Sequence, residues 1–117
     1  MQEADTTAAA DIAPPEARRL AAAGALLLDV REDEEWDAGH APGAVHLAMG
    51  LVGDRLEQLP SDRTVVCVCR VGGRSGSVAG ALAAAGFDVR NMAGGMVAWE
   101  HAGFPVTTDA GRPGRIV

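Results

Sequence analysis

The sequence predicts a single α/β domain, in which a parallel sheet of about five strands is covered by helices on both faces. Two continuous apolar runs, at residues 25–30 and 64–69, have the pattern of strands buried on both sides. Helical patterns alternate with strand patterns, which is typical of strands joined by crossover helices. The 117 residues suffice for one domain. We place it at residues 11–106, between a frayed N-terminal segment at 1–10 and a C-terminal tail at 107–117.

Breakers and apolar spacing define the individual elements. The Pro-Pro-Glu sequence at 14–16 suits the start of a helix, because proline is tolerated in a first turn and an acid interacts well with the helix dipole. Gly24, Gly39 and Gly86 each follow a helical pattern and end it. From these signals we expect strands at 12–13, 25–30, 45–47, 64–69 and 87–92, and helices at 14–23, 32–36, 50–59, 75–85 and 96–101.

Charge and cysteine content limit the possible partners and compartment. The net charge is −6, the ten basic residues are all arginine, and no basic run occurs, which argues against nucleic acid or an anionic membrane as partner. The apolar run at 26–28 is too short to span a bilayer, and the N-terminus has no cationic start. Cys67 and Cys69 do not form a disulfide framework, and a reactive thiol needs a reducing compartment. We therefore expect a cytoplasmic monomer.

Cys69 stands where a strand pattern gives way to a helix pattern, followed by a loop that contains Gly72 and Gly73. Two glycines let such a loop fold tightly, so that backbone N–H groups at the helix start converge on an anion. A helix N-terminus and nearby arginines lower the pKa of a cysteine and favour the nucleophilic thiolate. The sequence therefore predicts Cys69 as the catalytic residue. We predict that the substrate is bound by Arg70, Val71, Gly72, Gly73, Arg74 and Ser75.

Several of these residues have a simpler interpretation as well. Cys69 is alternatively a buried structural thiol, although its arginine and glycine neighbours argue against that. Arg70 either takes part in selecting the substrate or faces solvent at the rim, and Ser75 either binds an anion or caps the helix. Arg74 is a cation at the positive end of a helix, which is unfavourable unless an anion is expected there. The acids at 32–35 are interpreted as a solvated helix face.

Residues outside the loop are predicted to be structural. Cys67 lies two residues before Cys69 on the strand, too far and badly aimed for a disulfide, so we interpret it as core packing. Asp29 and Arg31 follow a strand near the site and are expected to form an ion pair that ties loops together. His40 and His46 are interpreted as held by turn contacts. No cluster of metal ligands stands out, and we expect no metal and no cofactor.

The motifs, in their order and spacing, resemble the rhodanese-like domain family in its single-domain sulfurtransferase form, over residues 12–106. The resemblance implies a central parallel sheet and a cysteine, here Cys69, that accepts a sulfane sulfur from a donor such as thiosulfate. The resulting persulfide passes its outer sulfur to cyanide, a thiol or a protein cysteine. The motifs that carry the resemblance are Leu-Leu-Asp-Val-Arg-Glu at 27–32, Glu-Glu-Trp at 34–36, Gly-His-Ala-Pro-Gly-Ala at 39–44, Cys-Arg-Val-Gly-Gly-Arg-Ser at 69–75, Gly-Phe at 86–87 and Gly-Gly-Met at 94–96 with Trp99.

Among proteins that resemble this chain, the length of the cysteine loop distinguishes sulfurtransferases from phosphatases. The loop from Cys69 to Arg74 has six residues, the size that the sulfurtransferases use. Related phosphatases and arsenate reductases have one residue more and commonly a His before the Cys, where this chain has Val68. A tetrahedral oxyanion needs more room than one sulfur atom, so the shorter loop favours sulfur. A sulfur-relay protein and a regulatory binding module stay open as alternatives, and a phosphatase or arsenate reductase is the other enzymatic one.

Overall fold

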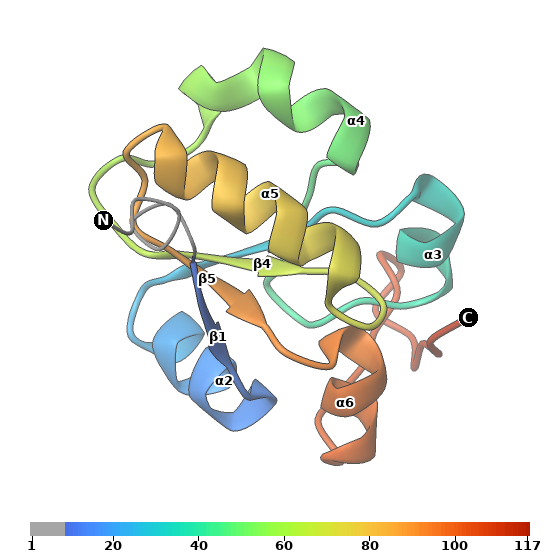
Figure 1. The fold of residues 1–117 in the computed structure, drawn as a ribbon. Helices are drawn as coiled ribbons and strands as arrows, with labels where there is room; N and C mark the ends of the chain where they lie inside the picture. Colours follow the sequence, from blue (N-terminus) through green and yellow to red (C-terminus); the bar gives the residue numbers. More distant parts are fainter. Residues whose placement is uncertain (1–8) are drawn as a thin grey trace.

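The computed structural model describes residues 9–117, which form a five-stranded parallel sheet with helices on both faces (Figure 1). The strands lie in the order β1-β5-β4-β2-β3, and every neighbouring pair is parallel. The fold class that the sequence predicts is therefore confirmed. The strands are β1 (Ala10–Ile12), β2 (Leu26–Asp29), β3 (Val45–His46), β4 (Val65–Val68) and β5 (Val89–Met92). The helices are α2 (Pro14–Ala22), α3 (Asp33–Ala38), α4 (Met49–Val52), the 3-10 helix η1 (Gly53–Gln58), α5 (Gly73–Ala84) and α6 (Gly95–His101).

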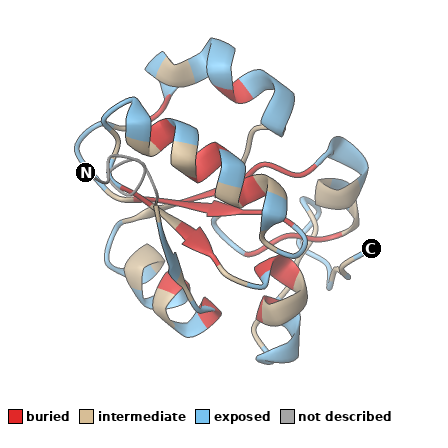
Figure 2. Cartoon of the chain, in the orientation of Figure 1, coloured by how far each residue is buried: buried red, intermediate tan, exposed pale blue. Residues whose placement is uncertain are grey.

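Strand β4 occupies the middle of the sheet, between β2 and β5, and its side chains divide between two cores. Val65 and Cys67 belong to the core that α5 covers, whereas Val66 and Val68 belong to the core on the opposite face. All four residues are buried, as the red colour of the central strands in Figure 2 shows. A strand that packs on both faces needs a continuous apolar sequence, and residues 64–69 have that pattern for this reason.

The helices form a layer on each face of the sheet (Figure 1). On one face, α5 contributes Val78 and Leu82 and α4 contributes Val52 to the core. On the other face, α2 contributes Ala17 and α6 contributes Trp99.

Several elements differ from the sequence prediction, and the helix expected at 50–59 differs most. The segment 50–59 has helical apolar spacing, but it divides into α4 and η1, and Arg55 has a non-helical backbone at φ −126° and ψ 24°. Gly50 and Gly53 lower the helix propensity there, and Leu51 is exposed rather than buried, so no continuous apolar face holds one helix together. Element ends differ as well. Helix α5 begins at Gly73, two residues earlier than predicted, α3 ends at Ala38, two residues later than predicted, and the strand expected at 12–13 lies at Ala10–Ile12.

The two terminal segments each contact the domain within the described part of the chain. Of the segment 1–10, expected to fray, residues 1–8 lie outside the described residues, and Ala10 begins β1 at the edge of the sheet. The segment 107–117, expected as a tail, lies along the end of α3. Thr107 and His40 exchange backbone hydrogen bonds of 2.8 and 2.9 Å, and Ile116 packs against the core. None of the helices within residues 9–117 combines the length and the apolar character needed to cross a membrane.

Candidate active site

Cys69 is the first residue after β4, and the loop that follows it leads directly into α5. Its side chain is 1% exposed and belongs to the core beneath α5, yet its sulfur lies where the strand ends and the backbone of the loop begins. In open parallel sheets the carboxyl ends of the strands are where ligands bind. The structure therefore places the predicted nucleophile at the expected edge of the sheet.

Three hydrogen-bond donors converge on the sulfur of Cys69. The backbone N–H of Gly72 lies 3.1 Å from Sγ, the backbone N–H of Ser75 lies 3.3 Å away, and the Ser75 hydroxyl lies 3.2 Å away. Burial alone raises the pKa of Cys69, but hydrogen bonds from the Ser75 side chain and from the backbone of Ser75, Gly72 and Val71 lower it by more, so the pKa lies below that of an ordinary thiol. The loop therefore stabilises a thiolate.

Gly72 gives the loop the shape that aims these donors. It has a φ of +105°, a conformation that side chains rarely adopt, and a Cβ there would approach the backbone N of Gly94 to 3.3 Å. Gly73, by contrast, opens into free space and has no positive φ. Only one of the two glycines that the sequence singled out is therefore required by the backbone.

The first turn of α6 forms backbone hydrogen bonds with the beginning of the cysteine loop. The N–H of Met96 donates to the carbonyl of Cys69 at 2.8 Å, and the N–H of Val97 donates to the carbonyl of Arg70 at 3.0 Å. Gly95 lies so close to both carbonyls that any side chain on it would clash. The Gly-Gly sequence at 94–95 thus lets α6 hold the loop in place.

Arg74 is bound by a carboxylate of the protein itself. Its guanidinium forms two hydrogen bonds with Glu35, at 2.8 and 2.9 Å, and this pairing lowers the pKa of Glu35 to about 2 and raises that of Arg74. The acids at 32–35, predicted to be a solvated face, therefore include a site residue that sequence reasoning missed. The unfavourable position of Arg74 at a helix start was the signal that an anion lies nearby.

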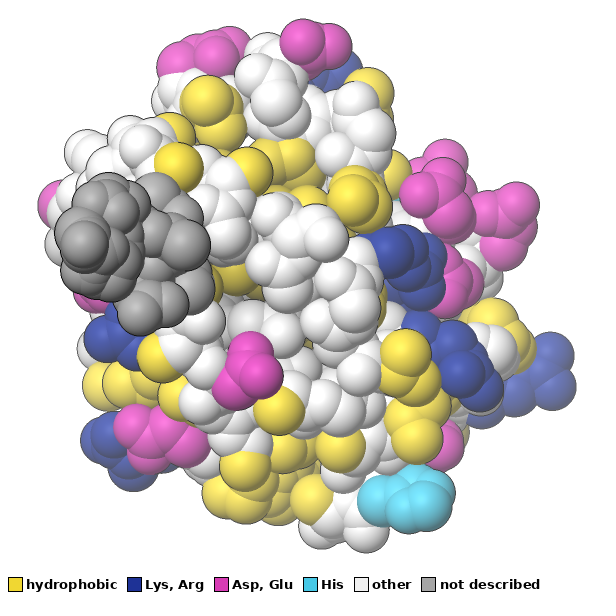
Figure 3. Space-filling model, viewed as in Figure 1, with side chains coloured by type: hydrophobic (Ala, Val, Ile, Leu, Met, Phe, Trp, Pro, Cys, Tyr) yellow, Lys and Arg dark blue, Asp and Glu magenta, His cyan; other side chains and the backbone are white. Residues whose placement is uncertain are grey.

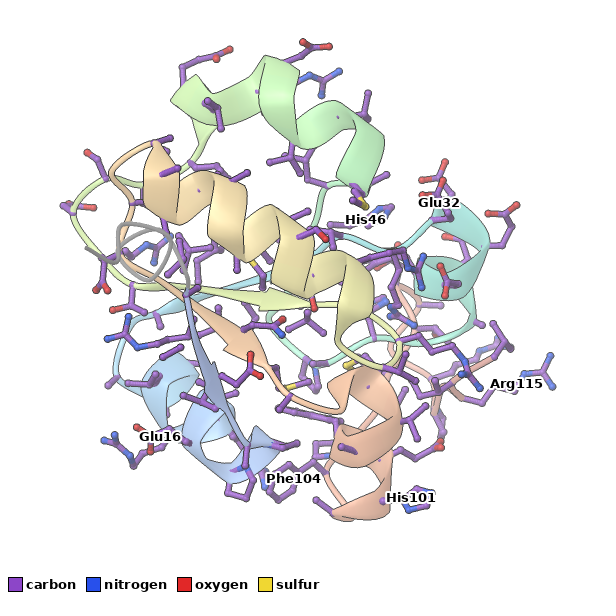
Figure 4. All side chains as sticks on the ribbon, viewed as in Figure 1. Glu16, Glu32, His46, His101, Phe104 and Arg115 are labelled. Carbon is purple, nitrogen blue, oxygen red and sulfur yellow. The ribbon has the colours of Figure 1, made fainter. Side chains whose placement is uncertain are left out.

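Glu35 is itself held by the first turn of α3. The backbone N–H of Glu32 donates to its carboxylate at 3.0 Å, as part of a reciprocal capping arrangement at the helix start. Figure 4 labels Glu32 there, with His46 close to the same end of the helix. Trp36, the next residue of α3, stacks on His40 with 3.5 Å between the ring centroids. These contacts give α3 a fixed position beside the loop.

Arg70 points outward from the loop. Its Nε donates to the carbonyl of Val117 at 3.0 Å, and its side chain is exposed. Val71 is also exposed, at 57%. Figure 3 shows arginine side chains gathered on the side of the molecule where α3 and the C-terminal segment lie. The predicted loop residues thus divide into donors that face the sulfur and side chains that form an outer rim.

Asp29 and Arg31 form a completely buried ion pair close to the site. The Arg31 guanidinium donates to both oxygens of Asp29, at 2.8 to 3.1 Å, and also to the carbonyl of Gly39 at 2.8 Å. The pair therefore joins the end of β2 to the end of α3, which is the loop-tying role that the sequence suggests. Its buried position makes it part of the frame that carries Glu35.

Asn91 is a second site residue that sequence reasoning missed. It lies on β5, is 5% exposed, and its amide oxygen lies 2.6 Å from the Ser75 hydroxyl. Its amide nitrogen donates to the carbonyl of Gly72 at 3.2 Å and to the carboxylate of Asp11 at 3.1 Å. The only signal in the sequence is a polar residue at a buried strand position, and such residues are hydrogen-bonded.

The arrangement defines an α/β protein with a cysteine of lowered pKa at the end of its central strand, in a loop whose backbone N–H groups converge on the sulfur. A sequence profile described as the rhodanese-like domain matches residues 13–102. The chain therefore belongs to the rhodanese-like domain family.

Individual relatives agree with this assignment. A sulfurtransferase of Allochromatium vinosum is 38% identical over 87 residues, which cover 74% of this chain and 81% of the relative. The thiosulfate sulfurtransferase GlpE of Pseudomonas syringae is 36% identical over 89 residues, 75% of this chain and 84% of the relative. The crystal structure of a rhodanese-related protein from Thermoplasma volcanium superposes with a TM-score of 0.81 at 23% identity, covering 86% and 99% of the two chains. The two named relatives support the transfer of sulfur groups as the general activity.

Proposed function

We propose that the protein is a sulfurtransferase that carries a sulfane sulfur on Cys69, taken from thiosulfate or a persulfide and passed to a thiophilic acceptor. The observation that carries this proposal is the convergence of backbone N–H groups from Gly72 and Ser75 on a buried sulfur. Such donors stabilise an anion. The names of the curated relatives support the same chemistry.

The first step is a displacement at the outer sulfur of the donor. The Cys69 thiolate attacks the sulfane sulfur of thiosulfate, a new S–S bond forms, and the bond between that sulfur and the sulfonate breaks with its electron pair leaving on sulfite. One thiolate and one thiosulfate dianion become one persulfide anion and one sulfite dianion, so charge and atoms balance. No proton moves, and the lowered pKa of Cys69 means that no separate base is needed.

The second step returns the enzyme to its starting state. An acceptor such as cyanide or a thiolate attacks the outer sulfur of the persulfide, the S–S bond breaks, and the electron pair returns to Cys69 as thiolate. The N–H groups of the loop stabilise the anion in both states, since the charge moves by only one sulfur atom. The cycle needs no metal and no cofactor, and it suits the cytoplasm, where thiols are kept reduced.

The two loop arginines take different parts in this scheme. Arg74 is already paired with Glu35, so most of its charge is offset within the protein. Arg70 is exposed at the rim, and its guanidinium has donors beyond the one bonded to Val117. We assign recognition of the donor sulfonate mainly to Arg70, and positioning of the loop to Arg74.

Steady-state kinetics test the proposal. With thiosulfate and cyanide we expect thiocyanate to form with the parallel-line pattern of a two-step transfer. Cys69→Ser should abolish turnover, whereas the matched variant Cys67→Ser should retain it, because Cys67 is a core residue away from the N–H donors. Hydrolysis of an aryl phosphate by the wild type, without thiocyanate formation, would instead indicate a phosphatase and overturn the proposal.

A further inference from the structure

The Ser75 hydroxyl lies between two groups that both accept its hydrogen. The sulfur of Cys69 is 3.2 Å from Oγ, and the amide oxygen of Asn91 is 2.6 Å from it. Both Ser75 and Asn91 are buried, so bulk water cannot donate a hydrogen bond to whichever acceptor, the sulfur or the amide oxygen, does not receive the Ser75 hydrogen. A hydroxyl has a single hydrogen. Ser75 therefore donates to Cys69 or to Asn91, and never to both at once.

The orientation of the Asn91 amide is fixed by its other contacts. Its NH₂ group donates to the carboxylate of Asp11 and to the carbonyl of Gly72, neither of which has a hydrogen to give. The reversed amide would place its oxygen against both of these oxygens. The amide oxygen must consequently face Ser75, where it acts only as an acceptor.

We propose that Asn91 is a positioning residue of the sulfur-transfer site, which competes with the Cys69 sulfur for the Ser75 hydroxyl hydrogen and so limits how strongly the thiolate is stabilised. The inference rests on the proposed function, because it assigns Asn91 a role in that same reaction. When Cys69 is a thiol, its S–H donates to Ser75, and Ser75 donates to Asn91. When Cys69 is a thiolate, Ser75 reaches the sulfur only by giving up its 2.6 Å bond to Asn91.

This competition benefits a sulfur carrier. The nucleophilicity of a thiolate falls as its pKa falls, and the backbone donors from Gly72 and Ser75 already stabilise the anion. In the persulfide the charge lies on the outer sulfur, and Sγ is uncharged. Ser75 then donates to Asn91 without cost. The arrangement therefore keeps the thiolate reactive and favours the loaded state over the bare one.

The other charged groups near Cys69 act independently of the Ser75 hydrogen. Arg74 favours the thiolate through its charge, and Cys67 interacts with it along the strand. His101, at the far end of α6, points away from the sheet (Figure 4). The titratable and charged groups around the site are Asp11 of β1, the Asp29–Arg31 pair at the end of β2, Glu32 before α3, Glu35 in α3, Cys67 of β4, Arg70 of the loop and Arg74 of α5.

A double-mutant cycle of Asn91→Ala and Ser75→Ala tests the proposal, with the pKa of Cys69 followed by the ultraviolet absorbance of the thiolate. Burial raises the pKa of Cys67 to about 12, so Cys67 does not interfere at pH values well below 12. Asn91→Ala should lower the pKa of Cys69 by about one pH unit, because Ser75 is then free to donate to the thiolate. In the Ser75→Ala background the same substitution should leave the pKa unchanged.

Kinetics supply a second readout that a merely structural role would not reproduce. At a pH where the wild-type and Asn91→Ala thiols are both ionised, loading by thiosulfate should slow about threefold in the variant, because its thiolate has the lower pKa. The matched control Val89→Ala removes a buried side chain from the same strand and should leave the pKa of Cys69 unchanged. If Asn91→Ala does not fold, Asn91→Val suits a strand and equally lacks the acceptor.

The proposal is overturned if Asn91→Ala leaves the pKa of Cys69 unchanged or raises it, or if the shift is the same with and without the Ser75 hydroxyl. The titration needs no sulfur donor, so its result is independent of the proposed function. A protein that shows the coupling but forms no persulfide would refute the proposed function alone.

Discussion

Cys67 and Cys69 are two residues apart and both buried, but their surroundings shift their pKa values in opposite directions. Cys67 is inside β4, where its neighbours are the paired strands and apolar side chains. Its pKa is raised to about 12, mainly by burial and to a smaller extent by the charge of the nearby Cys69. Cys69 is one residue beyond the strand, where the loop backbone has unpaired N–H groups to offer, and its pKa is lowered. The position at the end of the strand, rather than the residue type, is what lowers the pKa of Cys69.

Deforming the loop at Gly72 should reduce the difference in pKa between Cys67 and Cys69 the most. In Gly72→Ala the backbone either keeps a strained φ of +105° or changes conformation and loses the hydrogen bond from its N–H to the Cys69 sulfur. We expect a loss of about 1–2 kcal/mol in the free energy of unfolding. We also expect a rise of about one pH unit in the pKa of Cys69, and about tenfold slower sulfur loading near neutral pH.

Gly73→Ala is the matched control for Gly72→Ala. A Cβ at Gly73 meets no other atom, and the residue is already helical, so unfolding and the pKa of Cys69 should change little. Equal effects from the two substitutions, measured by urea unfolding and thiolate absorbance, would contradict the assigned role of Gly72.

A smaller effect on stability is expected from the Glu35–Arg74 ion pair, which lies beside the N–H donors. The folded pKa of Glu35 is about 2, below its ordinary value of 4.5, so its pairing with Arg74 adds stability that is full above pH 4.5 and is lost as the pH falls toward 2. Since Arg74 is about one-third exposed, solvent screening limits the effect to about 1 kcal/mol. Glu35→Gln should be less stable than the wild type by that amount at pH 7 and equally stable near pH 2.

Glu34→Gln removes an exposed acid from the same helix and is the control for this measurement. Its urea midpoint should match the wild type at both pH values. A Glu35→Gln variant whose deficit persists undiminished in acid would show that the carboxylate charge is not what holds Arg74.

The parts of the fold that follow from the sequence are those specified by local patterns. Residues 25–30 and 64–69 are continuous apolar runs because their strands are buried on both faces, and the loop after Cys69 is defined by consecutive residues. The break between α4 and η1 cannot be predicted from the sequence, because apolar spacing does not reveal that Leu51 is exposed. Local patterns thus predict the elements better than the exact extent of each helix.

The site residues that were missed depend on contacts between distant segments. Glu35 meets Arg74 across 39 residues of sequence, and Asn91 meets Asp11 across 80. Nothing in the chain near Glu35 distinguishes it from the three acids before it, and only the packing of α3 against the loop selects it. The sequence therefore predicts the loop whose backbone N–H groups converge on the Cys69 sulfur, but not the side chains that hold Arg74 and Ser75 in place.

Intact-mass analysis after incubation with thiosulfate tests the central claim most directly. The wild type should gain one sulfur atom, digestion should place it on Cys69 and not on Cys67, and cyanide should remove it. Cys67→Ala should gain the same mass, and Cys69→Ala should gain none. A wild type that gains no sulfur, or a Cys69→Ala variant that gains as much, would contradict the account.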